Sequence, residues 1–224
     1  MKTSVRSFAS TTSLFAVSLF AICLFLTSAR AQELPALTFQ GQGGNGTGSD
    51  TTRGYSFDVS AAGGVLVTGL TVYDDLGNGL AESHEVGLWD SNGTLLASVT
   101  VPAGTLAPLD SSGVFREVSL ATPLFLPAGS NYAVGAFSMV GSADVQAINW
   151  TSSSTAPGIT YDELRFINGP NVLTFPTSTL AGFTGLPGGS FDISAVPEPQ
   201  SWVLLGGGAC LLLWVGAKRR ARRA

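Results

Sequence analysis

Apolar and polar residues alternate with a period of two through much of the chain between residues 54 and 167. In 94–101, Leu95, Ala97 and Val99 fall on one face, and threonine and serine side chains fall on the other. Such alternation is typical of a half-buried β-strand, because successive side chains of a strand point to opposite faces. The same pattern predicts further strands at 54–59, 65–73, 85–90, 114–120, 132–137, 145–150 and 164–167. No run of ten residues in this region has the spacing of an amphipathic helix.

Turn-forming residues separate the predicted strands. Asp90-Ser91-Asn92-Gly93 stands between two of them, and an Asn-Gly pair supplies the backbone conformation that a hairpin turn requires. Several short strands with regularly spaced turns predict an all-β fold, an antiparallel β-sandwich of jelly-roll type. We place this domain at 54–176. A Gly- and Gln-rich N-terminal segment, 32–53, precedes it, and a loose linker, 177–195, follows it.

The N-terminus has the three parts of a secretory signal peptide, which we place at 1–31. Lys2 and Arg6 form a basic region, and 14–26 is an apolar core of 13 residues. Ala29 and Ala31 form an A-x-A cleavage site, so a signal peptidase is expected to cut before Gln32.

The C-terminus combines an apolar segment with a cluster of cations. Residues 202–217 contain no charge, and 16 residues of helix span about 24 Å, close to the thickness of a bilayer core. We therefore predict a transmembrane helix over 201–217. A basic tail, 218–224, follows it with these cations: Lys218, Arg219, Arg220, Arg222 and Arg223. Cations remain on the cytoplasmic side, so the preceding domain is expected to face outward.

A helix-breaking motif precedes this segment: Val196, Pro197, Glu198 and Pro199. The motif, the apolar helix and the Arg-rich end together resemble the PEP-CTERM sorting signal of Gram-negative bacteria, here at 196–224. The resemblance implies recognition by an exosortase, processing near the motif and a link to exopolysaccharide or biofilm. It also implies an inner-membrane location with a periplasmic domain before processing, and the cell surface or extracellular matrix afterwards.

The region between the two predicted cleavage sites is strongly acidic. Residues 32–199 contain all 15 acidic residues and only Arg53, Arg116 and Arg165, so the formal charge is 3 minus 15, or -12. Nucleic-acid binding is not expected, because phosphate contacts need clustered Lys and Arg. Both cysteines, Cys23 and Cys210, lie outside this region, which therefore has no disulfide framework.

A second resemblance concerns residues 69–105, which include the runs 70–74, 79–90 and 95–97. This stretch is similar to an extracellular β-sandwich domain of unknown function found in bacterial surface proteins. The resemblance implies a fold and a setting, and it carries no catalytic residues.

An acidic loop offers oxygen ligands for a cation. Residues 74–79 have oxygens and a glycine at calcium-loop spacing, but Leu76 stands where a third oxygen is required, so the loop is not an EF-hand. The candidate ligands of a structural Ca²⁺ are Asp74, Asp75, Asn78 and Glu82. A solvated turn is the alternative. No other cofactor is expected.

Three functions follow from these patterns. The first is a non-catalytic surface or matrix protein, since no G-x-S-x-G nucleophile motif is present. The second is a carbohydrate-binding module that stacks sugars on aromatic side chains. Its candidates are Trp89, Trp150, Tyr161 and Tyr73, with Trp150 expected to be the most exposed. The third is an extracellular hydrolase using His84, the only histidine, which the period of two places on the same side as Glu82.

Overall fold

The computed structural model describes residues 33–40, 50–144, 152–179 and 188–194, except for the side chain of Asp75. All of them belong to a compact unit spanning Gln32–Ala224. The described ranges contain strands and one short 3₁₀ helix, η1 (Asp75–Gly77). The strands are β1 (Glu33–Pro35), β2 (Leu37–Gln40), β3 (Thr51–Val59), β4 (Val65–Tyr73), β5 (His84–Trp89), β6 (Leu95–Val101), β7 (Phe115–Leu126), β8 (Gly129–Ser138), β9 (Ser152–Thr155), β10 (Ile159–Asn168), β11 (Ser178–Thr179) and β12 (Gly189–Ser194).

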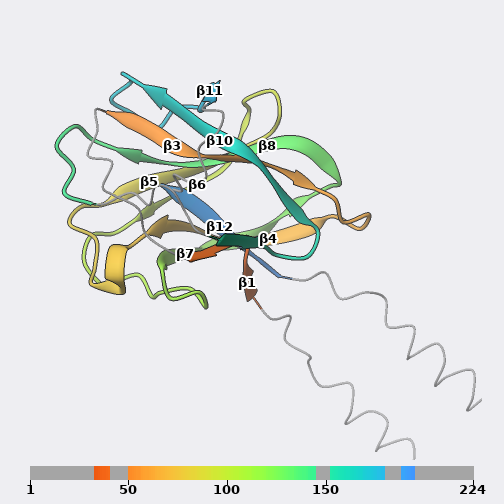
Figure 1. The fold of residues 1–224 in the computed structure, drawn as a ribbon, viewed down its shortest axis with the longest axis horizontal. Helices are drawn as coiled ribbons and strands as arrows, with labels where there is room; N and C mark the ends of the chain where they lie inside the picture. The colour runs from red at the N-terminus through yellow and green to blue at the C-terminus, as the bar shows by residue number, and fades with distance from the viewer. Residues whose placement is uncertain (1–32, 41–49, 145–151, 180–187, 195–224) are drawn as a thin grey trace, which may run out of the picture. The chain divides into compact units, whose positions relative to one another are not determined.

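These strands form two main sheets and one additional pair (Figure 1). One sheet has the order β1-β12-β4-β7, and the other has the order β11-β10-β3-β8-β5-β6. Strands β2 and β9 pair separately. Every pairing is antiparallel. The predicted all-β, antiparallel fold is confirmed.

The core lies where the two main sheets face each other. The rings of Phe57 in β3 and Phe191 in β12 are 4.6 Å apart between centroids, and both side chains are fully buried. Beside them, the hydroxyl oxygens of Tyr55 and Ser190 lie 2.8 Å apart and join the same two strands. Burying aromatic rings between two sheets is the arrangement of a β-sandwich.

The strand predictions hold best where the alternation is regular. Strand β4 occupies 65–73 as predicted, and the predicted turn after Asp90 joins β5 to β6 as a hairpin. The backbone N–H of Gly93 donates to the carbonyl of Asp90 at 3.0 Å, with φ of Gly93 at 80°. The strand predicted at 145–150 lies outside the described residues.

The predicted linker and N-terminal segment need correction. Strand β12 lies within the predicted linker 177–195, yet it is an inner strand of its sheet and pairs with both β1 and β4. Strands β1 and β2 lie within 32–53 and likewise belong to the folded domain. Their pairing partners are more than a hundred residues away in the sequence, so no local pattern marks where they pair.

Within the described ranges, no helix has the length and apolar character needed to cross a membrane. The predicted transmembrane helix over 201–217 and the signal peptide at 1–31 both lie outside those ranges.

Candidate functional site

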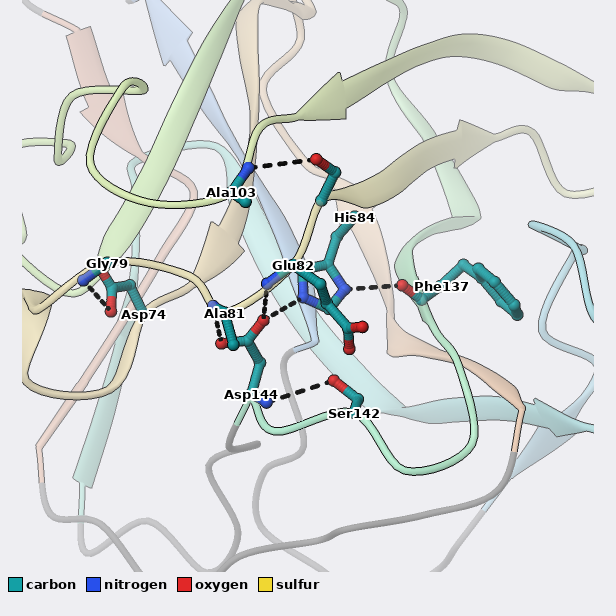
Figure 2. A network of polar contacts seen from close by, with 10 residues as sticks. Asp74, Gly79, Ala81, Glu82, His84, Ala103, Phe137, Ser142 and Asp144 are labelled. Atoms are coloured by element: carbon teal, nitrogen blue, oxygen red, sulfur yellow. Dashed lines mark hydrogen bonds and ion pairs between the residues drawn. The ribbon is translucent and has the colours of Figure 1, made fainter.

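Three potential metal ligands meet at one end of the six-stranded sheet (Figure 2). His84 is the first residue of β5, Glu82 precedes it by two positions, and Asp144 lies in the turn region after β8. The antiparallel pairing of β5 with β8 brings the two segments together. One ligand atom from each side chain lies within 4.8 Å of the other two. The prediction that Glu82 and His84 share one side of the chain is confirmed.

His84 is held by oxygen atoms at both ring nitrogens. Nδ1 lies 2.9 Å from the carbonyl oxygen of Phe137, and Nε2 lies 2.7 Å from Oδ2 of Asp144. The ring is almost completely buried. A carbonyl oxygen can only accept, so Nδ1 carries a proton and donates it to Phe137. The 2.7 Å contact between Nε2 and Oδ2 of Asp144 requires either one proton between the two atoms or a cation that both atoms bind.

Asp144 also organises the backbone that leads into β5. Its Oδ1 accepts the N–H of Ala81 at 2.7 Å, and its Oδ2 accepts the N–H of Glu82 at 3.1 Å. The N–H of Asp144 in turn donates to the hydroxyl of Ser142 at 3.3 Å. One carboxylate therefore joins the turn after β8 to the start of β5.

Glu82, the third residue of the cluster, has one buried carboxylate oxygen. The Oε1 atom has less than 1 Å² of exposed surface and no hydrogen-bond partner among the described residues. Leaving a carboxylate oxygen buried and unsatisfied is costly, so such an atom marks a place where a partner is expected.

A cavity of about 280 Å³ opens beside this cluster. Its walls combine carboxylates and the imidazole with exposed apolar side chains, among them Met139 and Val172. The remaining lining residues are Glu82, Ser83, His84, Glu85, Phe137 and Asn171. Glu82 and His84 therefore both border this cavity.

The predicted calcium ligands have a different environment. Asp74 is buried and accepts a hydrogen bond from Nε of Arg116 at 2.7 Å and from the N–H of Gly79 at 2.9 Å. An ion pair within the chain, rather than a cation from solution, thus neutralises Asp74. Asn78 ends the 3₁₀ helix η1, and the side chain of Asp75 is outside the described part of the structure. Glu82 turns instead to His84 and Asp144.

The aromatic candidates for sugar stacking are mostly core residues. Trp89 is buried and its ring meets that of Phe175 edge-to-face at 6.0 Å, and Tyr73 is also buried. Tyr161 is half-buried. Trp150 lies outside the described residues.

The other predicted site residues lie outside the described ranges as well. They are the cleavage-site residues Ala29 and Ala31, the motif residues Val196, Pro197, Glu198 and Pro199, and the cations Lys218, Arg219, Arg220, Arg222 and Arg223.

A second group of acids lies on the four-stranded sheet. Burial raises the pKa of Asp192 in β12 to about 8, and the negative charges of Asp110, Glu117 and Glu33 add to the shift. Burial likewise raises the pKa of Glu117, whose carboxyl hydrogen-bonds with that of Asp192. Below the folded pKa of Asp192, a proton shared between Asp192 and Glu117 removes the repulsion between two buried negative charges.

Sequence reasoning missed Asp144. It is 60 residues from His84, and only the pairing of β5 with β8 makes them neighbours. The residues around Asp144 form no pattern that indicates a ligand. The spacing of Glu82 and His84, in contrast, indicates that both lie on the same side of an extended chain.

Comparison with known proteins identifies one family. Residues 40–183 match the family described as "Domain of unknown function (DUF4082)". No curated protein and no solved structure is significantly similar to the chain.

Proposed function

The chain belongs to the DUF4082 family, and on this premise we propose that it is an exported, non-catalytic protein of the cell surface or extracellular matrix. In this proposal a signal peptidase removes 1–31, the helix over 201–217 anchors the chain in the inner membrane, and an exosortase processes it near Pro197. The product is associated with exopolysaccharide or biofilm.

One relationship between sequence and structure carries the proposal. Strands β1 and β12 both lie between the predicted signal-peptidase cut before Gln32 and the predicted motif at Val196. Cuts at both places would leave every described strand intact. The two ends also pair with each other, since Glu33 lies opposite Ser194. A sandwich whose ends meet is suited to attachment, and to release, at a single point.

The environment of His84 favours a non-catalytic role. A general base must present a free nitrogen to a substrate proton. Both ring nitrogens of His84 are already engaged by the carbonyl of Phe137 and the carboxylate of Asp144. The hydrolase alternative therefore has little support from this histidine.

The sandwich is, in this proposal, of jelly-roll type. Consecutive strands repeatedly change sheets: β3 and β4, β6 and β7, and β7 and β8 each lie in different sheets. Such crossings are characteristic of jelly rolls.

Intact mass of the protein recovered from its native envelope and medium tests the proposal. We expect a chain that begins at Gln32 and ends near Pro199. Replacing Pro197 and Pro199 with alanine is expected to leave the C-terminus at Ala224, whereas the neighbouring Gln200→Ala variant is processed normally. A wild-type protein that retains Ala224 in every fraction would rule out exosortase processing.

A groove favours carbohydrate binding as a second candidate function. It has a volume of about 440 Å³ and lies along the β2–β9 pair. Hydroxyl, amide and aromatic groups line it: Thr38, Phe39, Gln40, Ser112, Ser152, Ser153 and Ser154. Sugar sites commonly combine such hydrogen-bonding groups with an aromatic surface. Trp150 stands two positions before Ser152 in the sequence.

Glycan-array binding by the full chain in detergent tests this second function. Trp150→Ala is expected to abolish binding, and Ser153→Ala to weaken it. Phe125→Ala is the matched control, because it removes an exposed ring from a different strand, β7. If wild type and Trp150→Ala bind the same glycans equally well, this tryptophan does not form the sugar site.

A further inference from the structure

We propose that Glu82, His84 and Asp144 form a binding site for a divalent transition-metal ion of the Zn²⁺ class. The three side chains supply two carboxylates and one imidazole, with one ligand atom each within 4.8 Å of the others. The site is distinct from the calcium loop at 74–79, and it does not depend on sorting or on sugar binding.

The orientation of the imidazole is that of a metal ligand. Nδ1 donates to the backbone carbonyl of Phe137 at 2.9 Å, which leaves Nε2 to face Oδ2 of Asp144 at 2.7 Å. Metal-binding histidines characteristically donate their second ring N–H to a carbonyl or carboxylate, which fixes the tautomer and the ring plane. Here the carbonyl oxygen of Phe137, in strand β8, accepts this hydrogen bond and fixes the ring.

The charge balance of the cluster calls for a cation. Nε2 faces the acceptor Oδ2 of Asp144 at 2.7 Å, and the buried Oε1 of Glu82 has no partner among the described residues. One added proton on His84 would satisfy Asp144 but would leave Glu82 unsatisfied. A divalent ion can satisfy both carboxylates and the imidazole together.

The nitrogen ligand determines the class of metal. Ca²⁺ and Mg²⁺ prefer sites made entirely of oxygen, whereas imidazole suits zinc and other transition metals. Tetrahedral bonds of about 2.1 Å place two ligand atoms about 3.4 Å apart, so the gap between Nε2 and Oδ2 would widen by about 0.7 Å.

The cavity provides access to the ion. Glu82 and His84 both line this space of about 280 Å³, so the coordination positions that the chain does not fill are open to water. A bound ion would tie the start of β5 to the turn after β8 more tightly than hydrogen bonds alone. We therefore expect the metal to stabilise this end of the sandwich.

Zinc titration of the full chain tests the site. The protein is purified in detergent without a histidine tag, stripped with EDTA and titrated with ZnCl₂ by calorimetry. We expect one Zn²⁺ per chain, with affinity reduced more than about 100-fold in Glu82→Gln and in Asp144→Asn. Glu85→Gln is the matched control, because it removes an exposed carboxylate from the same cavity. It should bind like wild type.

Nitrogen NMR gives a second readout. His84 is the only histidine, so ¹⁵N-labelled histidine reports on this ring alone. Zn²⁺ is expected to shift the Nε2 resonance while Nδ1 keeps its proton. Glu82→Gln is the decisive variant, because Glu82 is only half-buried and its replacement should leave the fold intact. Circular dichroism in EDTA checks the fold of this variant.

Three results would overturn the proposal. They are no Zn²⁺ binding by the wild-type chain, equal binding by wild type and Glu82→Gln, and binding of Ca²⁺ as tightly as Zn²⁺.

Discussion

Nε of Arg116 lies 2.7 Å from Oδ2 of Asp74, and neither side chain is more than 5% exposed. The guanidinium also donates to the carbonyl oxygens of Ala107 and Gly77, each at 2.8 Å. One cation thus joins strand β7 to the residue that follows β4, to η1 and to the loop that contains Ala107. Removing one partner of a buried pair leaves the other charge uncompensated.

Asp74→Asn is therefore expected to lower the free energy of unfolding by about 3 kcal/mol or more. The matched control is Glu163→Gln, which removes the same charge from a partly exposed pair with Arg165 at 3.0 Å. Its cost should be below about 1 kcal/mol. Urea unfolding of the full chain, followed by tryptophan fluorescence, measures both. Equal costs for the two variants would contradict a dominant role for the buried pair.

The raised pKa of Asp192 predicts a stability that falls as pH rises. The folded pKa is about 8, well above the ordinary value of 3.8, so the folded chain holds a proton that the unfolded chain has lost between these values. The free energy of unfolding should decrease between about pH 4 and pH 8, by at most about 1.4 kcal/mol per unit from this group.

Asp192→Asn should reduce the dependence of the free energy of unfolding on pH. It should also stabilise the chain at pH 8, because the amide has no charge to bury. Some slope remains from Glu117 and Asp110, whose pKa values burial also raises. Glu85→Gln, at an exposed site, should keep the wild-type slope. Urea unfolding at pH 5 and pH 8 makes the comparison. A steeper slope in Asp192→Asn than in wild type would show that the sign is wrong.

A close approach of two strands explains a glycine at position 54. Gly54 in β3 stands opposite Gly135 in β8, and a Cβ at position 54 would lie 1.8 Å from the carbonyl oxygen of Val134. Backbone cannot rotate away as a flexible side chain can. Gly54→Ala should thus cost about 3 kcal/mol or more.

Gly63→Ala is the control for this effect, since a Cβ there meets nothing within 4 Å. It is expected to be neutral or to stabilise by up to about 1 kcal/mol. Thermal unfolding of both variants provides the measurement, and a well-folded Gly54→Ala protein with wild-type stability would contradict the close approach.

The hydrogen bond between Tyr55 and Ser190 links the two main sheets. The oxygens are 2.8 Å apart, both residues are buried, and burial raises the pKa of the Tyr55 hydroxyl above its ordinary value. A double-mutant cycle of Tyr55→Phe and Ser190→Ala should give a coupling free energy of about 0.5–1.5 kcal/mol. A coupling near zero would mean that each hydroxyl is satisfied independently.

The alternation of side chains was sufficient to predict much of the all-β fold. Strand β4 and the β5–β6 hairpin could be predicted because their signals are local: a period of two and an Asn-Gly turn. Strand β12 was missed although Phe191 and Ile193 alternate with polar residues. Its polar residues Ser190 and Asp192 are themselves buried, so the usual distinction between an inner and an outer face does not apply.

Part of the candidate site could likewise be predicted from the sequence, and part of it depended on the tertiary structure. The spacing of Glu82 and His84 places them on one side of an extended chain, and this is a property of the backbone alone. Whether Glu82 would lie with Asp74 or with Asp144 depended on which strands pair. Residues 60 positions apart become neighbours only through the β5–β8 pairing, and Asp74 is neutralised by Arg116, 42 positions away. Short-range order follows from local geometry, whereas ligand sets and charge partners depend on contacts between distant segments.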